Sequence, residues 1–107
     1  MTDKKEILEK LSNLSVDQLD KLKDEKLVEY KQALHEYHQA KDDEMVCRHN
    51  KRKELLKEHS HSKTEQILRA DDELFQLKRK ILLTADIKNQ LKLTIEVLNN
   101  YFWKARQ

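Results

Sequence analysis

The stretch CRHNKRKELLKEHSHSK, residues 47–63, gathers the side chains of this sequence that are best suited to chemistry. It holds the only cysteine, three of the five histidines and six of the 22 basic residues of the chain. Such a combination could form a zinc site, an activated thiol or a phosphate-binding patch. Each of these sites needs a particular spacing, because metal ligands and catalytic groups must converge on one point.

The spacing argues against a metal site. Cys47 and His49 lie two positions apart, and helical residues with that spacing point in directions about 200° apart. His59 and His61 have the same spacing and could share an ion only in an irregular turn. Zinc needs three or four ligands, and the spacings of zinc fingers and zinc ribbons are absent. We therefore expect no metal and no cofactor.

The sequence also argues against enzymatic activity. Because the chain contains no glycine, it cannot form a glycine-rich phosphate loop or a nucleophile elbow. Cys47 is followed by Arg48 and His49, as an activated thiol could be. A polar helix face, however, seldom gives a thiolate the spatial organisation that catalysis requires. We therefore expect a protein that is not an enzyme and has no small-molecule substrate.

A nucleic-acid interface is the stronger functional alternative for this stretch. Residues 48–57 could present a basic patch that neutralises phosphate charge without reading base sequence. Glu54 interrupts the patch, and no aromatic residue is interleaved to stack on bases. The candidate nucleic-acid-binding residues are Arg48, Lys51, Arg52, Lys53 and Lys57.

The composition favours a few long helices with short connections to position these residues. Glycine and proline are both absent, and 39% of the residues are charged against 37% hydrophobic. Without glycine, tight hairpin turns are disfavoured, and without proline nothing forces a kink. A thin apolar supply suits helices that each bury one stripe. This lysine-rich, glycine-free composition resembles that of small helical proteins of bacteriophages and other mobile elements in AT-rich genomes.

The chain is predicted to form one all-α domain, residues 1–107. Capping signals divide this domain into three helices. A short helix is predicted over 1–14. Ser15 and Gln18 form a capping-box pattern with Leu14 and Leu19 at the two staple positions. The predicted segments that follow are a long helix over 15–58, a turn over 59–64 that ends in a second capping pattern at Ser62, and a long helix over 65–107.

The two long segments predict an antiparallel helical hairpin with the short helix at its open end. A continuous rod through the HSHS sequence is the structural alternative. The second helix changes character along its length, because its apolar spacing gives way to charged residues after Tyr37. The apolar residues predicted to face the third helix are Leu19, Leu27, Tyr30, Leu34 and Tyr37.

The third helix carries a heptad repeat with isoleucine at a and leucine at d, which favours coiled-coil association. A second apolar stripe of Leu68, Phe75 and Leu82 flanks this seam. A two-stranded coiled coil does not need so wide an apolar face, so this helix is expected to contact both the second helix and another chain. A three-helix monomer is the alternative. The predicted self-association residues are Ile67, Leu74, Leu77, Ile81, Leu91, Ile95, Leu98 and Phe102.

The aromatic C-terminal segment offers a second candidate interaction site. Three consecutive aromatic residues cannot all face one direction on a helix, so Tyr101 and Trp103 are candidate partner-binding residues. Ile7, Leu8 and Leu11 of the first helix could cover them instead.

The charge pattern and the absence of targeting signals complete the functional expectation. Residues 1–47 carry 8 basic and 12 acidic side chains, whereas residues 48–63 carry 6 and 2. The N-terminal segment lacks a signal-peptide core, and no apolar run could span a bilayer. We expect a cytoplasmic or particle-enclosed assembly, scaffold or adaptor protein that binds itself, as a dimer or larger assembly, and another protein. A nucleic-acid-associated regulator and an inhibitor that docks on a host protein are the alternatives.

Overall fold

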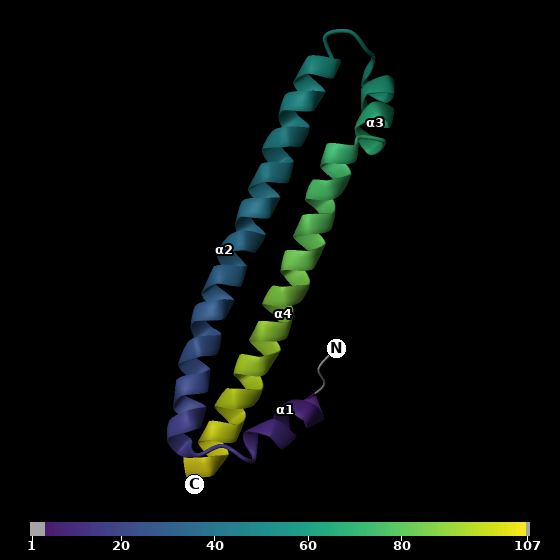
Figure 1. Ribbon diagram of the computed structural model, residues 1–107. Helices are drawn as coiled ribbons and strands as arrows, with labels where there is room; N and C mark the ends of the chain where they lie inside the picture. Colours follow the sequence, from purple (N-terminus) through teal and green to yellow (C-terminus); the bar gives the residue numbers. More distant parts are fainter. Residues whose placement is uncertain (1–3, 107) are drawn as a thin grey trace. The chain divides into compact units, whose positions relative to one another are not determined.

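The computed structural model describes residues 4–106, without the side chains of residues 4, 7, 8, 102 and 104–106. Every regular element in the described chain is an α-helix (Figure 1). The helices are α1 (Lys4–Leu11), α2 (Val16–Leu55), α3 (His61–Arg69) and α4 (Asp72–Arg106). α2 packs against α4 in a hairpin-like arrangement, so the predicted hairpin is confirmed and the continuous rod is wrong. None of the described helices combines the length and apolar character that crossing a membrane requires.

The chain divides into two compact units. Unit 1 comprises residues 1–34 and 86–107, and unit 2 comprises residues 35–85. In unit 1, α1 and the adjoining parts of α2 and α4 share a hydrophobic core. Its buried members are Leu11, Leu19, Val97 and Leu98, and Leu14, Leu22 and Tyr101 pack against them.

The start of α2 has the capping geometry that the sequence predicts. The Ser15 backbone N–H donates to Gln18 Oε1 at 2.9 Å, and the Gln18 N–H donates to Ser15 Oγ at 3.3 Å. Leu14 and Leu19, at the two staple positions, both belong to the unit 1 core. The capping box and the staple are therefore confirmed, and together they set the entry of the chain into α2.

The inward face of α2 is polar or small along most of its length. Buried and half-buried positions recur at alternating spacings of four and three residues, as a heptad seam requires. These positions are Leu19, Lys23, Lys26, Tyr30, Ala33, Tyr37, Ala40, Glu44, Cys47 and Lys51. The predicted Leu27 and Leu34 are half-buried at the flanks of this seam. Large aliphatic side chains are thus supplied mainly by α4.

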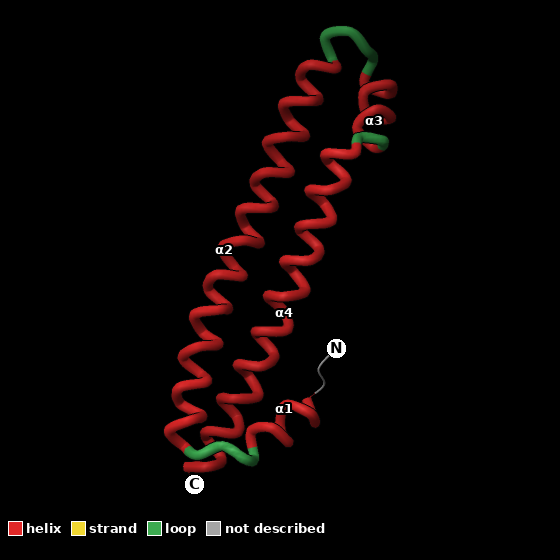
Figure 2. The backbone as a smooth tube through the Cα atoms, in the orientation of Figure 1, coloured by secondary structure: helices red, strands yellow, loops and turns green. Residues whose placement is uncertain are grey.

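The turn of unit 2 lies earlier than predicted. α2 ends at Leu55, and the loop over 56–60 leads directly into α3, as the green segment between them shows in Figure 2. Ser60 is the N-cap of α3, because its side chain accepts a hydrogen bond from the Lys63 N–H at 3.3 Å. The predicted boundary of 59–64 with a cap at Ser62 is corrected accordingly.

The predicted helix over 65–107 is interrupted at Ala70 and Asp71. The Ala70 N–H donates to the Ile67 carbonyl at 3.2 Å and closes α3. Asp71 then caps α4, since Asp71 Oδ1 accepts from the Leu74 N–H at 2.9 Å. Leu68 and Leu74 are both buried on either side of the break. The apolar repeat therefore continues where the helix does not, which is why the repeat alone predicted one helix.

Candidate interaction surface

The basic side chains of residues 48–57 are largely engaged within unit 2. Lys51 Nζ lies 2.8 Å from Asp71 Oδ2 and 2.9 Å from Glu73 Oε2, so it joins α2 to the start of α4. Arg52 Nε lies 2.9 Å from Glu65 Oε1 of α3. The two remaining pairs are local: Arg48 with Glu44 at 3.6 Å and Lys57 with Glu54 at 3.1 Å.

These ion pairs reduce the positive charge available to a phosphate backbone. Four of the five candidate nucleic-acid-binding residues have a carboxylate partner. Lys53 is exposed and has no ion-pair partner among the described residues. Binding of nucleic acid would have to compete with these contacts, so phosphate neutralisation would release less free energy than the count of basic residues indicates. Nucleic-acid binding stays a prediction.

The Lys51 contacts shift the protonation equilibria around them. The hydrogen bonds from Lys51 lower the pKa of Asp71 and of Glu73 below their ordinary values, and the same bonds raise the pKa of Lys51. Burial, followed by the nearby Glu73 carboxylate, raises the pKa of the Cys47 thiol. A raised pKa keeps the thiol protonated at neutral pH, so Cys47 lacks the character of an activated nucleophile.

The ion-paired cluster of Lys51, Asp71 and Glu73 predicts a loss of stability in acid. A carboxylate with a lowered pKa in the folded state stabilises it above the ordinary pKa, here 3.8 for Asp71 and 4.5 for Glu73. That stabilisation disappears as the pH falls through the lowered values. Lys51→Met is expected to reduce the steepness of acid destabilisation below about pH 4.5, and urea unfolding between pH 2.5 and 7 would measure it.

Lys53→Met is the matched control for this experiment, because Lys53 is exposed on the same helix. Its acid profile is expected to follow that of the wild type. If Lys51→Met and the wild type lose stability in parallel as the pH falls, the cluster does not govern the acid response.

His59 and His61, considered as possible metal ligands, do not form a metal site in the described part of the chain. His59 and His61 flank the capping Ser60, and both side chains are exposed. Among the described residues, no group of three or more His, Cys, Asp or Glu side chains is arranged to hold a metal ion. The histidines are therefore solvated side chains of the turn and the first residue of α3.

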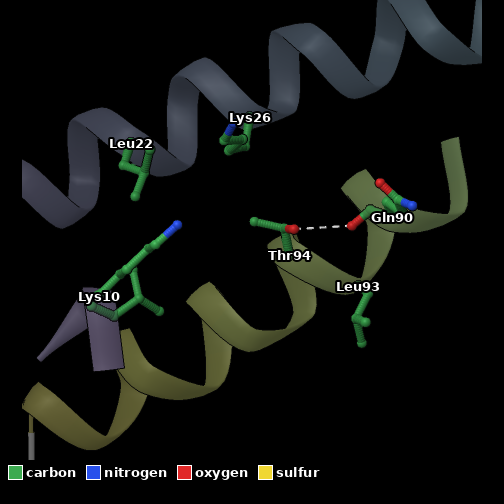
Figure 3. Close-up of a pocket in the computed structure, with 7 residues that line it drawn as sticks. Lys10, Leu22, Lys26, Gln90, Leu93 and Thr94 are labelled. Carbon is green, nitrogen blue, oxygen red and sulfur yellow. Dashed lines mark hydrogen bonds between the residues drawn. The ribbon is translucent and has the colours of Figure 1, made fainter. Parts of the chain in front are cut away.

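A cleft of about 300 Å³ lies within unit 1 between α1, α2 and α4. Figure 3 shows Lys10 reaching from α1 toward Leu22 of α2, with Thr94 on the opposite wall. The Thr94 hydroxyl donates to the Gln90 carbonyl at 2.9 Å, and Lys26 Nζ pairs with Glu29 at 3.1 Å. The residues that line the cleft include no carboxylate, histidine, cysteine or tyrosine, so the cleft offers neither a nucleophile with its base nor a paired acid and base.

The heptad seam of α4 faces inward in both units. In unit 2, Leu74 and Thr84 are buried, and Leu77 and Ile81 are half-buried. In unit 1, Leu98 is buried, and Leu91 and Ile95 are half-buried. Ile67 is half-buried in α3. The predicted self-association residues whose side chains are described thus pack within the chain, and their role between chains stays a prediction.

Tyr101 and Trp103 of the aromatic segment lie in different environments, as expected from their spacing on a helix. Tyr101 packs against the unit 1 core, whereas Trp103 is exposed. The side chain of Phe102 lies outside the described residues, as do those of Ile7 and Leu8. Leu11 of α1 is buried in the core against which Tyr101 packs.

Comparison with protein-family models, curated proteins and solved structures yields no match to this chain. A proposal for its function therefore rests on the residues that the chain exposes.

The outward face of α4 in unit 2 is the strongest candidate interaction surface. Phe75, Leu82 and Leu83 are 60%, 68% and 55% exposed. Residues at spacings of seven and eight lie on one side of a helix, so the three side chains form a single apolar stripe. We call this stripe, together with the charged residues Asp72 and Arg79 on the same side, the α4 outer face.

Sequence periodicity found only part of the α4 outer face. Phe75 and Leu82 belong to the predicted flanking stripe, whereas its third predicted member, Leu68, is buried in α3. Leu83 was missed, although its spacing of eight from Phe75 is also a helical repeat. The capping role of Asp71 was missed too, although the acidic run that it begins is a helix-start signal.

Proposed function

We propose that the protein is a non-enzymatic assembly or adaptor component that binds another protein chain through the α4 outer face. The supporting observation is the exposure of Phe75, Leu82 and Leu83 on one side of α4, while the heptad seam of the same helix is buried or half-buried. Contiguous apolar groups on a charged surface are typical of interaction sites. Amphipathic helices present such faces to partner chains at helical spacing.

The size of this face sets the affinity that it can support. Full burial of one leucine or phenylalanine contributes about 1.5–3 kcal/mol. Part of that area is already covered in the chain, and association itself costs at least about 4 kcal/mol. Three such side chains therefore support weak binding unless polar contacts add to them. A partner must match the charges of the α4 outer face as well as its apolar groups.

The alternatives find less support in the described surface. A nucleic-acid-associated regulator would use residues 48–57, whose basic groups are mostly ion-paired within unit 2. An inhibitor that docks on a host protein would be a special case of partner binding through an exposed face. The nucleic-acid alternative has no exposed group of residues comparable with Phe75, Leu82 and Leu83 in its favour.

Affinity capture with the tagged protein tests the proposed function. Bait carrying the wild-type sequence is incubated with a cell extract to which untagged protein has been added, and the retained chains are quantified. Leu82→Ser is expected to reduce retention of the bound chain at least tenfold, because it replaces a leucine of the binding face by a polar residue. Circular dichroism would confirm that the variant keeps its helix content.

Two other exposed apolar residues provide matched controls. Val28 is as exposed as Leu82, and Trp103 is the predicted aromatic anchor. Val28→Ser and Trp103→Ser are both expected to retain wild-type binding. Loss of binding in Trp103→Ser with retention in Leu82→Ser would transfer the site to the aromatic segment. If neither added copies nor extract proteins are retained, the proposed function is wrong.

A further inference from the structure

We propose that the cleft of unit 1 binds the anion of an aliphatic carboxylic acid, a ligand with one carboxylate and a short hydrocarbon chain. The inference goes beyond the proposed function and is independent of it. All residues that line the cleft belong to unit 1, whereas the α4 outer face lies in unit 2. The lining combines two lysines with three leucines, and this combination indicates the class of ligand.

The charged groups that line the cleft are both positive. They are Lys10 of α1 and Lys26 of α2, and Figure 3 shows the Lys10 ammonium directed into the space between α2 and α4. Lys10 has no ion-pair partner among the described residues, whereas Lys26 Nζ lies 3.1 Å from Glu29 Oε2. Glu6 and Glu9 precede Lys10 on α1, but neither lines the cleft. One ammonium group is therefore available to an anion, and the other is partly neutralised.

The apolar lining suits a hydrocarbon chain better than a compact inorganic anion. Leu22 is half-buried and Leu93 is 36% exposed, so both can offer apolar surface to a ligand. Each methylene group that is removed from water against such side chains adds to the affinity. The volume of about 300 Å³ lies at the lower limit for small-molecule sites, which indicates a short chain.

The polar lining suits a carboxylate that is bound and not converted. A lysine ammonium and a side-chain amide both donate hydrogen bonds to carboxylate oxygens, and Lys10 and Gln90 supply these two groups. The Thr94 hydroxyl already donates to the Gln90 carbonyl at 2.9 Å. Because no histidine, cysteine or tyrosine lines the cleft, it lacks the base and the nucleophile that a reaction would need.

A bound anion would contact all three helices of unit 1. Lys10 lies in α1, Leu22 in α2 and Leu93 in α4. A ligand that binds the folded chain and not the unfolded one stabilises the folded chain by mass action. The anion is therefore expected to raise the midpoint of thermal unfolding, which gives a measure of binding that does not depend on calorimetry.

Titration calorimetry of the full chain with sodium octanoate tests the proposal. Octanoate is expected to bind saturably at one site and to raise the midpoint of thermal unfolding. Butanoate has four methylene groups fewer, so its affinity is expected to be at least about tenfold lower. Octylammonium has the same chain with the opposite charge, and its affinity is also expected to be at least about tenfold lower.

Lysine substitutions locate the site. Lys10→Met removes the ammonium group but keeps a long side chain, and it is expected to weaken octanoate binding about tenfold. Lys26→Met is expected to weaken it by up to about threefold, because Lys26 already pairs with Glu29. Lys5→Met is the matched control, since Lys5 is an exposed lysine of α1 that does not line the cleft. Its affinity is expected to stay within about twofold of the wild-type value.

Three results would overturn the proposal. The first is the absence of saturable octanoate binding up to about 10 mM. The second is octylammonium that binds as tightly as octanoate, because the cleft would then not select an anion. The third is equal octanoate affinity in Lys10→Met and Lys5→Met, with helix content confirmed by circular dichroism. None of these results changes the capture experiment with Leu82→Ser, so the proposed function stands or falls separately.

Discussion

Leu98→Ala is expected to lower the free energy of unfolding by about 2–5 kcal/mol. Leu98 is 1% exposed and lies in the unit 1 core with Leu11, Leu19 and Val97. Truncation to alanine removes its buried methyl groups and leaves a cavity that helix backbones cannot easily close. Urea unfolding followed by circular dichroism measures the change.

Leu93 provides a matched comparison, because it is an exposed leucine on the same helix in the same unit. Leu93→Ala is expected to cost less, about 1–2 kcal/mol, because 36% of Leu93 is already exposed to water in the folded chain. Equal losses for the two variants would mean that the unit 1 core does not depend on Leu98.

Ala40→Leu is the second substitution with a large expected effect, about 1–3 kcal/mol of destabilisation. Ala40 is 0% exposed on the inward face of α2, so no space remains beside its methyl group. A leucine would force neighbouring side chains from their rotamers or separate the packed helices locally. Thermal and urea unfolding would show the loss, even though leucine has nearly the helix propensity of alanine.

Gln39→Leu makes the same kind of change at the adjacent, exposed position. It removes one surface hydrogen bond from Gln39 Nε2 to Asp43 Oδ1 at 2.9 Å. The expected change is within about 0.5 kcal/mol. An Ala40→Leu variant as stable as Gln39→Leu would show that α2 has room at this position.

The contrast between α2 and α4 explains how far the sequence predicts the fold. The inward face of α4 was predicted because isoleucine and leucine repeat every seven residues. The inward face of α2 was predicted only in part. Leu19, Tyr30 and Tyr37 lie on it as predicted, whereas Ala33, Ala40 and Cys47 were missed because they occupy positions where a large aliphatic residue would be expected. A helix can bury small or amphipathic side chains when the helix packed against it contributes the large apolar side chains. The hydrophobicity pattern of one segment does not reveal which side chains the other helix contributes.

The candidate surface shows the same limit. The sequence predicted that α4 has more apolar width than one partner uses, and Phe75 and Leu82 are indeed exposed. The sequence did not show which of the two apolar stripes faces α2, since both stripes repeat every seven residues. Only the packing of α2 assigns one to the interior. The engaged state of Lys51 and Arg52 likewise depends on carboxylates of α3 and α4 that are distant in sequence.

The composition of the two units has a consequence for the order of folding. Unit 2 is one continuous segment, residues 35–85, whereas unit 1 combines residues 1–34 with residues 86–107. Closing a loop costs more conformational entropy as the intervening chain lengthens, and non-local contacts form more slowly than local ones. During synthesis, unit 2 can form while residues 86–107 are still missing. Until residues 86–107 are synthesised, residues 1–34 lack the part of α4 against which they pack. Leu11 and Leu19 are then exposed to solvent or chaperones.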